Sequence, residues 1–490
     1  MGAGRVLYIH PSKLPVDRPC DWSAGASPYL LAPMGVIGLA NTLRAHGVEV
    51  VGVNYPSEVA LEPTFRLVPW LLQQRDVRLV MVDLHWYEHA YGAMDVVRAC
   101  KHVWPDVPVL LGGLTATRFA DEIMANFRAV DYLLRGDPEL PAVELAEGLL
   151  GGGLRAEQIA NLSHRVDGQP VHNDRTYHAG LRELEALDFV DTSFFVGDQR
   201  YARFQSSDFG RLSGQWLCVG RGCHMNCGFC GGSKKSHLAL SGREAVLTRR
   251  PELVADDVAR LSARGLGQVS LSHDPAVLGR PYWSRLFEAI QDRRVRIGLY
   301  NECWQLPGLD WVEAVADTFV VADSQLAISP LSGDEEVRRL NGKHYPNERL
   351  LQFLSALERR RIRIFVYFSL NLPGETEATL ERTIALASQI VRSYPRELVT
   401  VANMLHTIAP ESAFANEPER FGIEVQMRTF MHYYEYAYLT PYARPEAKIG
   451  RVRGFDVKPP GSRSLARMAA MWDAAAAELG PTCKPIPPVW

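Results

Sequence analysis

The sequence lacks several features, and each absence excludes a class of protein. No apolar stretch in the 490 residues reaches the roughly 18 positions that a membrane-spanning helix needs. Basic residues do not outnumber acidic ones, and a formal net charge of −3 gives no electrostatic reason to expect a nucleic-acid partner. The first residues run directly into an apolar strand without a targeting segment, so we expect a cytoplasmic protein.

Cysteine is also scarce, with eight in the chain and no framework of a secreted, disulfide-bonded protein. Most of them are scattered and are typical of core or incidental thiols: Cys20, Cys100, Cys218, Cys303 and Cys483. The other three form one compact group, Cys223-His-Met-Asn-Cys227-Gly-Phe-Cys230, after a strand-like run at 215–220. A four-iron cluster normally binds four thiolates, so three thiolates leave one iron open to a substrate or cofactor.

A structural zinc site is the alternative interpretation of these cysteines. Zinc closes its shell with four ligands, usually as two separated pairs, and the sequence has no second pair. His224 or His237 could supply a fourth ligand, so the residues alone leave zinc open.

The Cys-x3-Cys-x2-Cys spacing resembles the cluster loop of the radical S-adenosylmethionine (SAM) enzymes. The resemblance implies a [4Fe–4S] cluster whose open iron is chelated by SAM, and an electron that releases a 5′-deoxyadenosyl radical. It also implies that the backbone beside the last cysteine, at Phe229, Gly231 and Gly232, passes near SAM.

Residues 1–145 alternate strands and helices. Near-continuous apolar strands separated by helices predict a doubly wound, Rossmann-like parallel sheet covered on both faces, with its ligand at the carboxyl ends of the strands. The predicted helix covers 33–46, and the predicted strands are 5–10, 48–54, 79–83, 107–111 and 130–134.

The ends of these strands carry glycines and acidic residues, in Gly112-Gly113-Leu-Thr and Gly136-Asp137-Pro-Glu. Together with the cysteine loop, this layout resembles the cobalamin-binding domain of the cobalamin-dependent radical SAM enzymes. The cobalamin contacts that the resemblance implies are Leu84, His85, Trp86, Gly112, Gly113, Leu114, Thr115, Gly136, Asp137 and Glu139.

One motif of many cobalamin proteins is missing. They carry Asp-x-His-x-x-Gly after the first strand, and its histidine binds cobalt. Here Asp83-Leu-His85 resembles its first half but follows the third strand, and Glu88 stands where the glycine should be. The resemblance therefore implies cobalamin without a histidine ligand from that motif. His85 and His89 are otherwise explained as hydrogen-bonded or surface histidines.

The rest of the chain divides into three further parts. Residues 146–205 are expected to be a wrapping linker with a short hairpin near Asp167-Gly168, and 206–415 a second domain of six strand–helix units. Such units suit a partial (β/α)6 barrel with its site at the strand ends, which is also the family fold. Residues 416–490 are expected to be a small, mainly α region that caps the barrel, with an aromatic-rich core formed by Phe430, Tyr433, Tyr434, Tyr436, Tyr438 and Tyr442.

The barrel strand ends also match the family. Ser329, Asn371, Pro373 and Gly374 are the implied SAM contacts, the last three within Asn371-Leu-Pro-Gly-Glu-Thr376, which is close to the family's Leu-Pro-Gly-Glu-Thr turn. The turn has a plainer explanation, because Thr376 can cap the following helix. Other polar residues near strand ends could contact substrate but are more often structural: His273, Asp274, Glu302 (just past the third strand) and His406.

The leading hypothesis is a cobalamin-dependent radical SAM methyltransferase. The resemblance implies a methyl group passing from methylcobalamin to an unactivated carbon of a small, natural-product-type molecule, with electrons from a flavodoxin- or ferredoxin-like protein. A non-methylating relative that performs cyclisation, ring contraction or rearrangement fits the same motifs. Methylthio transfer to RNA would need more cluster cysteines and a basic module, and a non-enzymatic cobalamin sensor would leave Cys223, Cys227 and Cys230 without a role.

Overall fold

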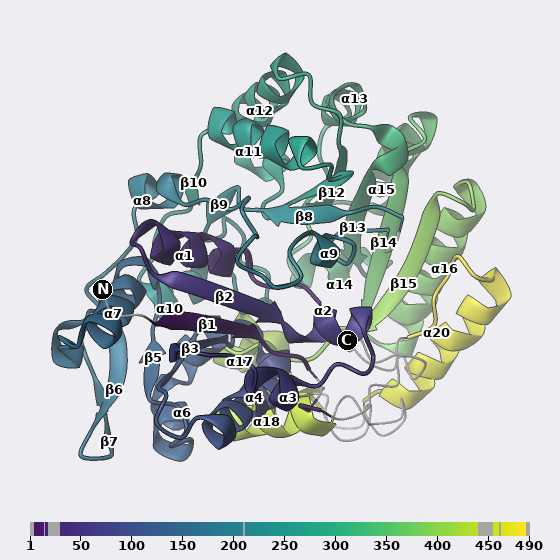
Figure 1. The fold of residues 1–490 in the computed structure, drawn as a ribbon. Helices are drawn as coiled ribbons and strands as arrows, with labels where there is room; N and C mark the ends of the chain where they lie inside the picture. Colours follow the sequence, from purple (N-terminus) through teal and green to yellow (C-terminus); the bar gives the residue numbers. More distant parts are fainter. Residues whose placement is uncertain are drawn as a thin grey trace.

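The computed structural model describes residues 4–13, 15–17, 30–208, 211–439, 454–459 and 462–486. Two parallel sheets, each covered by helices, form the two halves of the molecule (Figure 1). Cys20 and Tyr442 lie outside the described residues. In the described part, no helix is long and apolar enough to cross a membrane.

The first sheet has the strand order β2-β1-β3-β4-β5-β6-β7. Its five parallel strands confirm the alternation predicted for the N-terminal part: β1 (Arg5–His10), β2 (Glu49–Asn54), β3 (Val77–Asp83), β4 (Val109–Gly112) and β5 (Tyr132–Leu134). The hairpin expected near Asp167 is β6 (Leu162–Val166) with β7 (Gln169–His172). This hairpin pairs antiparallel with β5, so part of the expected linker instead extends the first sheet.

Helices cover both faces of this sheet. Val6 and Tyr8 of β1 pack with α1 (Met34–Ala45) and α7 (Glu139–Gly151), whereas Leu7 and Ile9 belong to the core on the opposite face, with α4 (Ala90–Val103). Alternate residues of a strand point to opposite faces, so a strand that is apolar throughout requires cover on both sides.

The second sheet has the order β15-β14-β13-β12-β11-β8, all parallel. Its strands are β8 (Gly214–Leu217), β11 (Gln268–Leu271), β12 (Gly298–Cys303), β13 (Gln325–Leu331), β14 (Arg363–Leu370) and β15 (Val399–Leu405). The helices on its outer face are α11 (Pro251–Ala263), α12 (Arg280–Asp292), α13 (Leu309–Thr318), α15 (Asn347–Arg359) and α16 (Glu377–Ser393). Because β8 and β15 are the two edges, the six predicted units form an open, partial barrel.

Two expectations need correction. Glu302 lies within β12 and not past its end, because the strand is longer than its apolar run. The aromatic helix α18 (Phe430–Leu439) packs on α4 of the first half, where Tyr433 lies 5.3 Å from the ring of Tyr87. This helix therefore contributes to the core of the first half, while α20 (Leu465–Leu479) covers α16 of the barrel.

Candidate active site

The three cysteines lie in the loop between β9 (Gly220–Arg221) and α10 (Lys234–Ser241), beyond the carboxyl end of β8. Backbone N–H groups of Met225 and Gly232 donate to the sulfurs of Cys223 and Cys230, each at 3.3 Å. Burial raises the pKa of all three thiols, that of Cys230 to about 12. Thiolates at these positions therefore need a bound cation, as metal ligation provides.

The spacing of the sulfurs bears on which metal they can hold. The three Sγ atoms do not all lie within 4.8 Å of one another. Tetrahedral zinc with Zn–S bonds of about 2.3 Å would bring its ligand sulfurs to roughly 3.8 Å apart. The sulfurs are therefore not all as close together as in a closed zinc site.

The loop takes its path because its backbone packs against the segment after β15. A Cβ on Gly231 would lie 2.4 Å from the carbonyl oxygen of Pro410, whereas one on Gly232 would meet only the Cys230 sulfur, at 3.8 Å. The Ser236 hydroxyl donates to the Glu411 carbonyl at 2.8 Å. Of the two glycines, Gly231 is thus required by packing, and Gly232 is open beside the cluster cysteines.

The residues of the turn predicted to contact SAM form hydrogen bonds with other residues of the protein. The Asn371 side chain donates to the His406 carbonyl at 2.9 Å and accepts from Arg463 at 2.6 Å, and Pro373 accepts from Asn341 at 3.1 Å. Gly374 has φ +79°, which suits glycine. Thr376 caps α16 by accepting from the Thr379 N–H at 3.2 Å, as the plainer explanation of the turn predicted.

Polar groups line the inside of the barrel close to the cysteines. Leu299 and Cys303 of β12 pack outward against the helices, so alternation turns Tyr300 and Glu302 inward. The Tyr300 hydroxyl donates to Glu302 at 3.3 Å, and burial raises the pKa of Glu302.

Two further inward groups complete this lining. Ser329 of β13 hydrogen-bonds with Tyr367 of β14. The ammonium of Lys343 donates to the Trp304 carbonyl at 2.6 Å and is close enough to Cys227 to interact with its charge. Tyr300, Tyr367 and Lys343 were missed in the sequence, although the alternation that buries their strand neighbours could have shown the two tyrosines.

Most of the cobalamin contacts implied by the sequence gather around one cavity of about 210 Å³. The deep wall between α1 and the sheet is apolar, with Leu39, Leu43, Met81 and Leu110. The mouth is formed by the carboxyl ends of β3, β4 and β5 and, from the second half, by Arg221, His237, Ser241 and Arg243.

Most of the predicted residues line this cavity: His85, Gly112, Gly113, Leu114, Gly136, Asp137 and Glu139. Leu84, Trp86 and Thr115 do not belong to its lining, and they hold the surrounding loops. Leu84 is fully buried, the Thr115 hydroxyl donates to the His85 carbonyl at 3.0 Å, and the Trp86 ring lies 4.9 Å from that of His85.

Of the two glycines after β4, one is open to the cavity and the other is required by packing, a difference like that between the two after Cys230. Gly112 would have nothing within 4 Å of an added Cβ, which leaves the backbone open to a ligand. Gly113 has φ +114°, and its Cβ would lie 2.7 Å from the backbone of Leu84 and His85. Gly113 is required by the neighbouring loop rather than by a ligand.

Asp137 and Glu139 also join the two halves of the protein. Asp137 accepts from Arg221 at 3.1 Å and from the Ala179 N–H at 2.9 Å, and it is ion-paired with Arg243. Glu139 pairs with Arg221 as well. Because Arg221 begins the cluster loop, these buried pairs hold the cavity of the first half against the cluster of the second.

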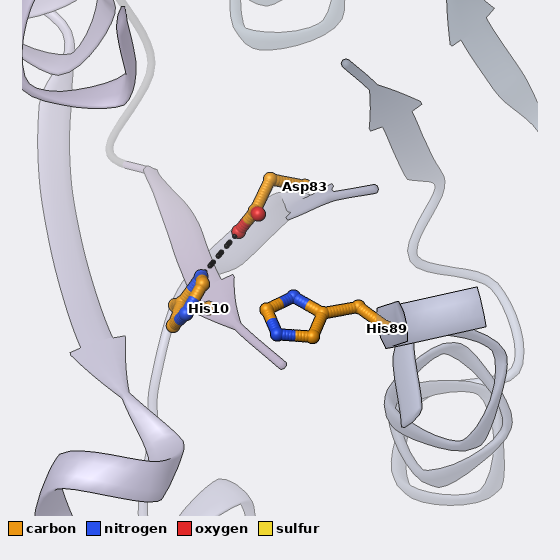
Figure 2. Close-up of side chains that lie close together, drawn as sticks. All are labelled: His10, Asp83 and His89. Atoms are coloured by element: carbon orange, nitrogen blue, oxygen red, sulfur yellow. Dashed lines mark hydrogen bonds and ion pairs between the residues drawn. The ribbon is translucent and has the colours of Figure 1, made fainter. Parts of the chain in front are cut away.

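His10, Asp83 and His89 lie close together (Figure 2), and Asp83 also lines the cavity. All three are buried, and their donor atoms lie within 4.8 Å of one another. Two imidazoles and a carboxylate are a common set of ligands for zinc or iron. The Asp83 carboxylate already accepts from His10 at 2.9 Å and from the Tyr8 hydroxyl at 2.6 Å.

Family models match two parts of the chain. The radical SAM superfamily matches residues 217–387, and the B12 binding domain matches residues 24–146. These matches imply a [4Fe–4S] cluster with SAM in the second half and cobalamin in the first. The cysteines and the shared cavity provide residues that fit both.

One curated relative is similar over part of the chain. A protein from Pyrococcus horikoshii described as an uncharacterized methyltransferase is 24% identical over 202 residues, which is 41% of this chain and 40% of that relative. The chain thus spans less than half the length of this curated relative.

Solved structures share the fold over more of the chain. The radical SAM methyltransferase TsrM from Kitasatospora setae, with tryptophan and a SAM analog bound, has a TM-score of 0.66 at 16% identity, covering 97% of this chain and 88% of TsrM. TsrM with cobalamin and a [4Fe–4S] cluster bound has a TM-score of 0.64 at 15% identity, and the match covers 98% of this chain and 88% of TsrM. The cobalamin-dependent SAM radical enzyme OxsB gives 0.54 at 11% identity, covering 78% of this chain and 51% of OxsB.

Proposed function

Since the chain belongs to the cobalamin-dependent radical SAM enzymes and is like their methyltransferases, we propose that it transfers a cobalamin-borne methyl group to an unactivated carbon of a small, natural-product-type molecule. The observation that supports this most is the shared cavity, because strand-end loops of the first sheet and residues flanking the cluster loop line the same space. Both cofactors would then face one substrate.

In this proposal the bound cluster and SAM supply a carbon radical, and bound cobalamin supplies the methyl group. The chain's own residues hold and orient these groups. Cys223, Cys227 and Cys230 bind the iron, and the buried pairs of Arg221 with Asp137 and Glu139 keep the two halves at a fixed separation and exclude water between them. The reductant is expected to be a flavodoxin- or ferredoxin-like cytoplasmic protein.

The inside of the barrel favours a particular kind of substrate. Trp216 and Tyr300 contact each other there at 5.6 Å, and Phe365 and Tyr367 stack at 5.6 Å. The Glu302 carboxylate beside them suits a ligand ammonium group. We therefore propose an aromatic amine or amino acid as the first class to test, and tryptophan, which is bound in a TsrM structure, belongs to it.

The experiment separates methyl transfer from other radical chemistry before the substrate is known. Anaerobically reconstituted protein with cobalamin is given SAM with a deuterated methyl group and a reductant. We expect S-adenosylhomocysteine and deuterium-labelled methylcobalamin by mass spectrometry, and label in the product once an aromatic amine is accepted. Formation of 5′-deoxyadenosine with no S-adenosylhomocysteine and no label on cobalamin would favour the non-methylating alternative.

A matched variant checks that the two uses of SAM are distinct. Cys230→Ala removes one cluster ligand and leaves the cavity lining intact. Under a chemical reductant we expect this variant to form S-adenosylhomocysteine while losing 5′-deoxyadenosine. Unchanged 5′-deoxyadenosine formation would contradict the assignment of the cluster to these cysteines.

A further inference from the structure

The loop after β3 presents one imidazole to the cavity. His85 lines it, and the backbone of this loop is fixed on both sides, since Leu84 donates to the Gly112 carbonyl at 2.7 Å and Thr115 donates to the His85 carbonyl at 3.0 Å. Among the described residues, no hydrogen bond occupies the His85 ring. Its main chain is therefore held firmly, whereas its ring nitrogens remain available to a ligand.

Asp83 supplies a second group at the same place. Its Oδ1 accepts from the Tyr8 hydroxyl at 2.6 Å and from His10 at 2.9 Å, as Figure 2 shows for His10. Its Oδ2 is buried and has no hydrogen-bond partner among the described residues, although Asp83 lines the cavity. A buried carboxylate oxygen without a partner is costly, so a donor is expected there when the cavity is filled.

We propose that His85 is the axial nitrogen ligand of cobalt on the corrin face turned toward the first sheet, with Asp83 accepting a hydrogen bond from the other ring nitrogen. A histidine that binds a metal usually donates its second N–H to a carboxylate, which orients the ring and strengthens the ligand. Asp83 is held for this role by Tyr8 and His10. The sequence places Asp83-x-His85 at the end of the third strand, where the usual cobalamin motif does not occur.

The charge environment agrees with this assignment. The alternative use of Asp83, a separate metal ion with His10 and His89, is disfavoured by Lys13, whose buried ammonium acts on His89 and would repel a divalent cation.

This inference rests on cobalamin binding and not on methyl transfer. Its test needs neither turnover nor substrate, so its failure is distinguishable from failure of the proposed function. The spectrum of bound cob(II)alamin reports the axial ligand directly, because one axial nitrogen splits each cobalt line into a triplet. Protein made with ¹⁵N-histidine converts the triplet to a doublet if the nitrogen comes from the protein and not from the cofactor's own base.

We expect the doublet in ¹⁵N-histidine protein, its loss in His85→Ala, and its return as a doublet when ¹⁵N-imidazole is added to that variant. The matched control is His237→Ala, which removes an imidazole from the opposite wall of the cavity and should leave the splitting unchanged. If His85→Ala does not retain cobalamin, the nitrogen splitting is measured in His85→Gln and in the ¹⁵N-histidine wild-type protein, and these two spectra decide whether His85 is the ligand. Absence of nitrogen splitting in the wild type, a triplet insensitive to the label, or loss of splitting only in His237→Ala would overturn the assignment.

Discussion

Asp137→Ala tests whether the two halves are held together by buried charge. Asp137 is 6% exposed, and it receives hydrogen bonds from Arg221, Arg243 and the Ala179 N–H. The Arg243 side chain is only 8% exposed, so removing the carboxylate leaves its guanidinium buried beside no other acidic partner that the described residues supply. In this variant Arg221 would still form its ion pair with Glu139.

The expected cost follows from this arrangement. Removing one partner of a buried ion pair typically costs about 3–5 kcal/mol. We expect the lower end, about 3 kcal/mol, because Glu139 still compensates Arg221. For a domain of roughly 200 residues this corresponds to a fall in Tm of about 6–12 °C. Calorimetry or fluorescence-monitored melting of the cofactor-free protein measures it.

The matched control is Asp121→Ala, whose side chain is 88% exposed and faces His172 at 3.4 Å. Its effect should stay within about 0.5 kcal/mol. In the double variant Asp137→Ala/Arg243→Met, the loss should be smaller than the sum of the single losses, since the unpaired charge is gone. Equal Tm shifts for Asp137→Ala and Asp121→Ala would refute the reasoning. So would a loss of stability in the double variant equal to the sum of the two single losses.

Three other changes give distinct outcomes. Gly231→Ala should prevent cluster assembly because its Cβ would meet a carbonyl oxygen at 2.4 Å, whereas Gly232→Ala should assemble normally. The two variants are compared by iron content and visible absorbance after reconstitution. Equal iron contents would contradict the packing argument. Burial lowers the pKa of His406 to about 4, so the unfolded chain binds a proton first as the pH falls from 6.5. The wild type should then lose about 1–2 kcal/mol between pH 7.5 and pH 5 in urea unfolding, and His406→Phe should lose less. Tyr433→Ala should destabilise the first half by about 3 kcal/mol, as the loss of a buried aromatic ring does. Its control is Met431→Ala, on the exposed face of the same helix, and similar unfolding midpoints for the two would show that the helix does not form part of that core.

Local sequence patterns were sufficient for the sheets and the cluster loop. Most of the parallel strands contain a short apolar run, whose position depends on neighbouring residues only, whereas the β6–β7 hairpin was expected from its turn. The spacing of the three cysteines is likewise local. The glycines at the strand ends remain predicted cobalamin contacts. The packing role of Gly113 was not predicted, because the close approach of Leu84 is set by the fold and not by the residues beside it.

Contacts between distant segments could not be predicted. The partners of Asp137 lie 84 and 106 residues further along the chain, so no periodicity or motif links them. The aromatic spacing of α18 indicated a buried face, but it was wrong for Tyr438, which is 37% exposed; the buried residues are Phe430, Tyr433 and Ala437. An amphipathic pattern also does not specify which surface covers it. For the same reason the barrel mouth was an equally acceptable place for this helix until the fold placed it on α4.

Arg221 connects the cavity of the first half to the cluster loop of the second. Its guanidinium pairs with Asp137 and Glu139, which line the cavity of the first half. Its backbone pairs with Leu247, and the chain reaches Cys223 only two positions later. A shift of the first half is therefore transmitted to the cluster loop through the Arg221 side chain, beside the second contact of Asp137 with Arg243. Because a reaction between two cofactors depends on their separation, a fixed charged contact at this point suits such a reaction better than a flexible linker would.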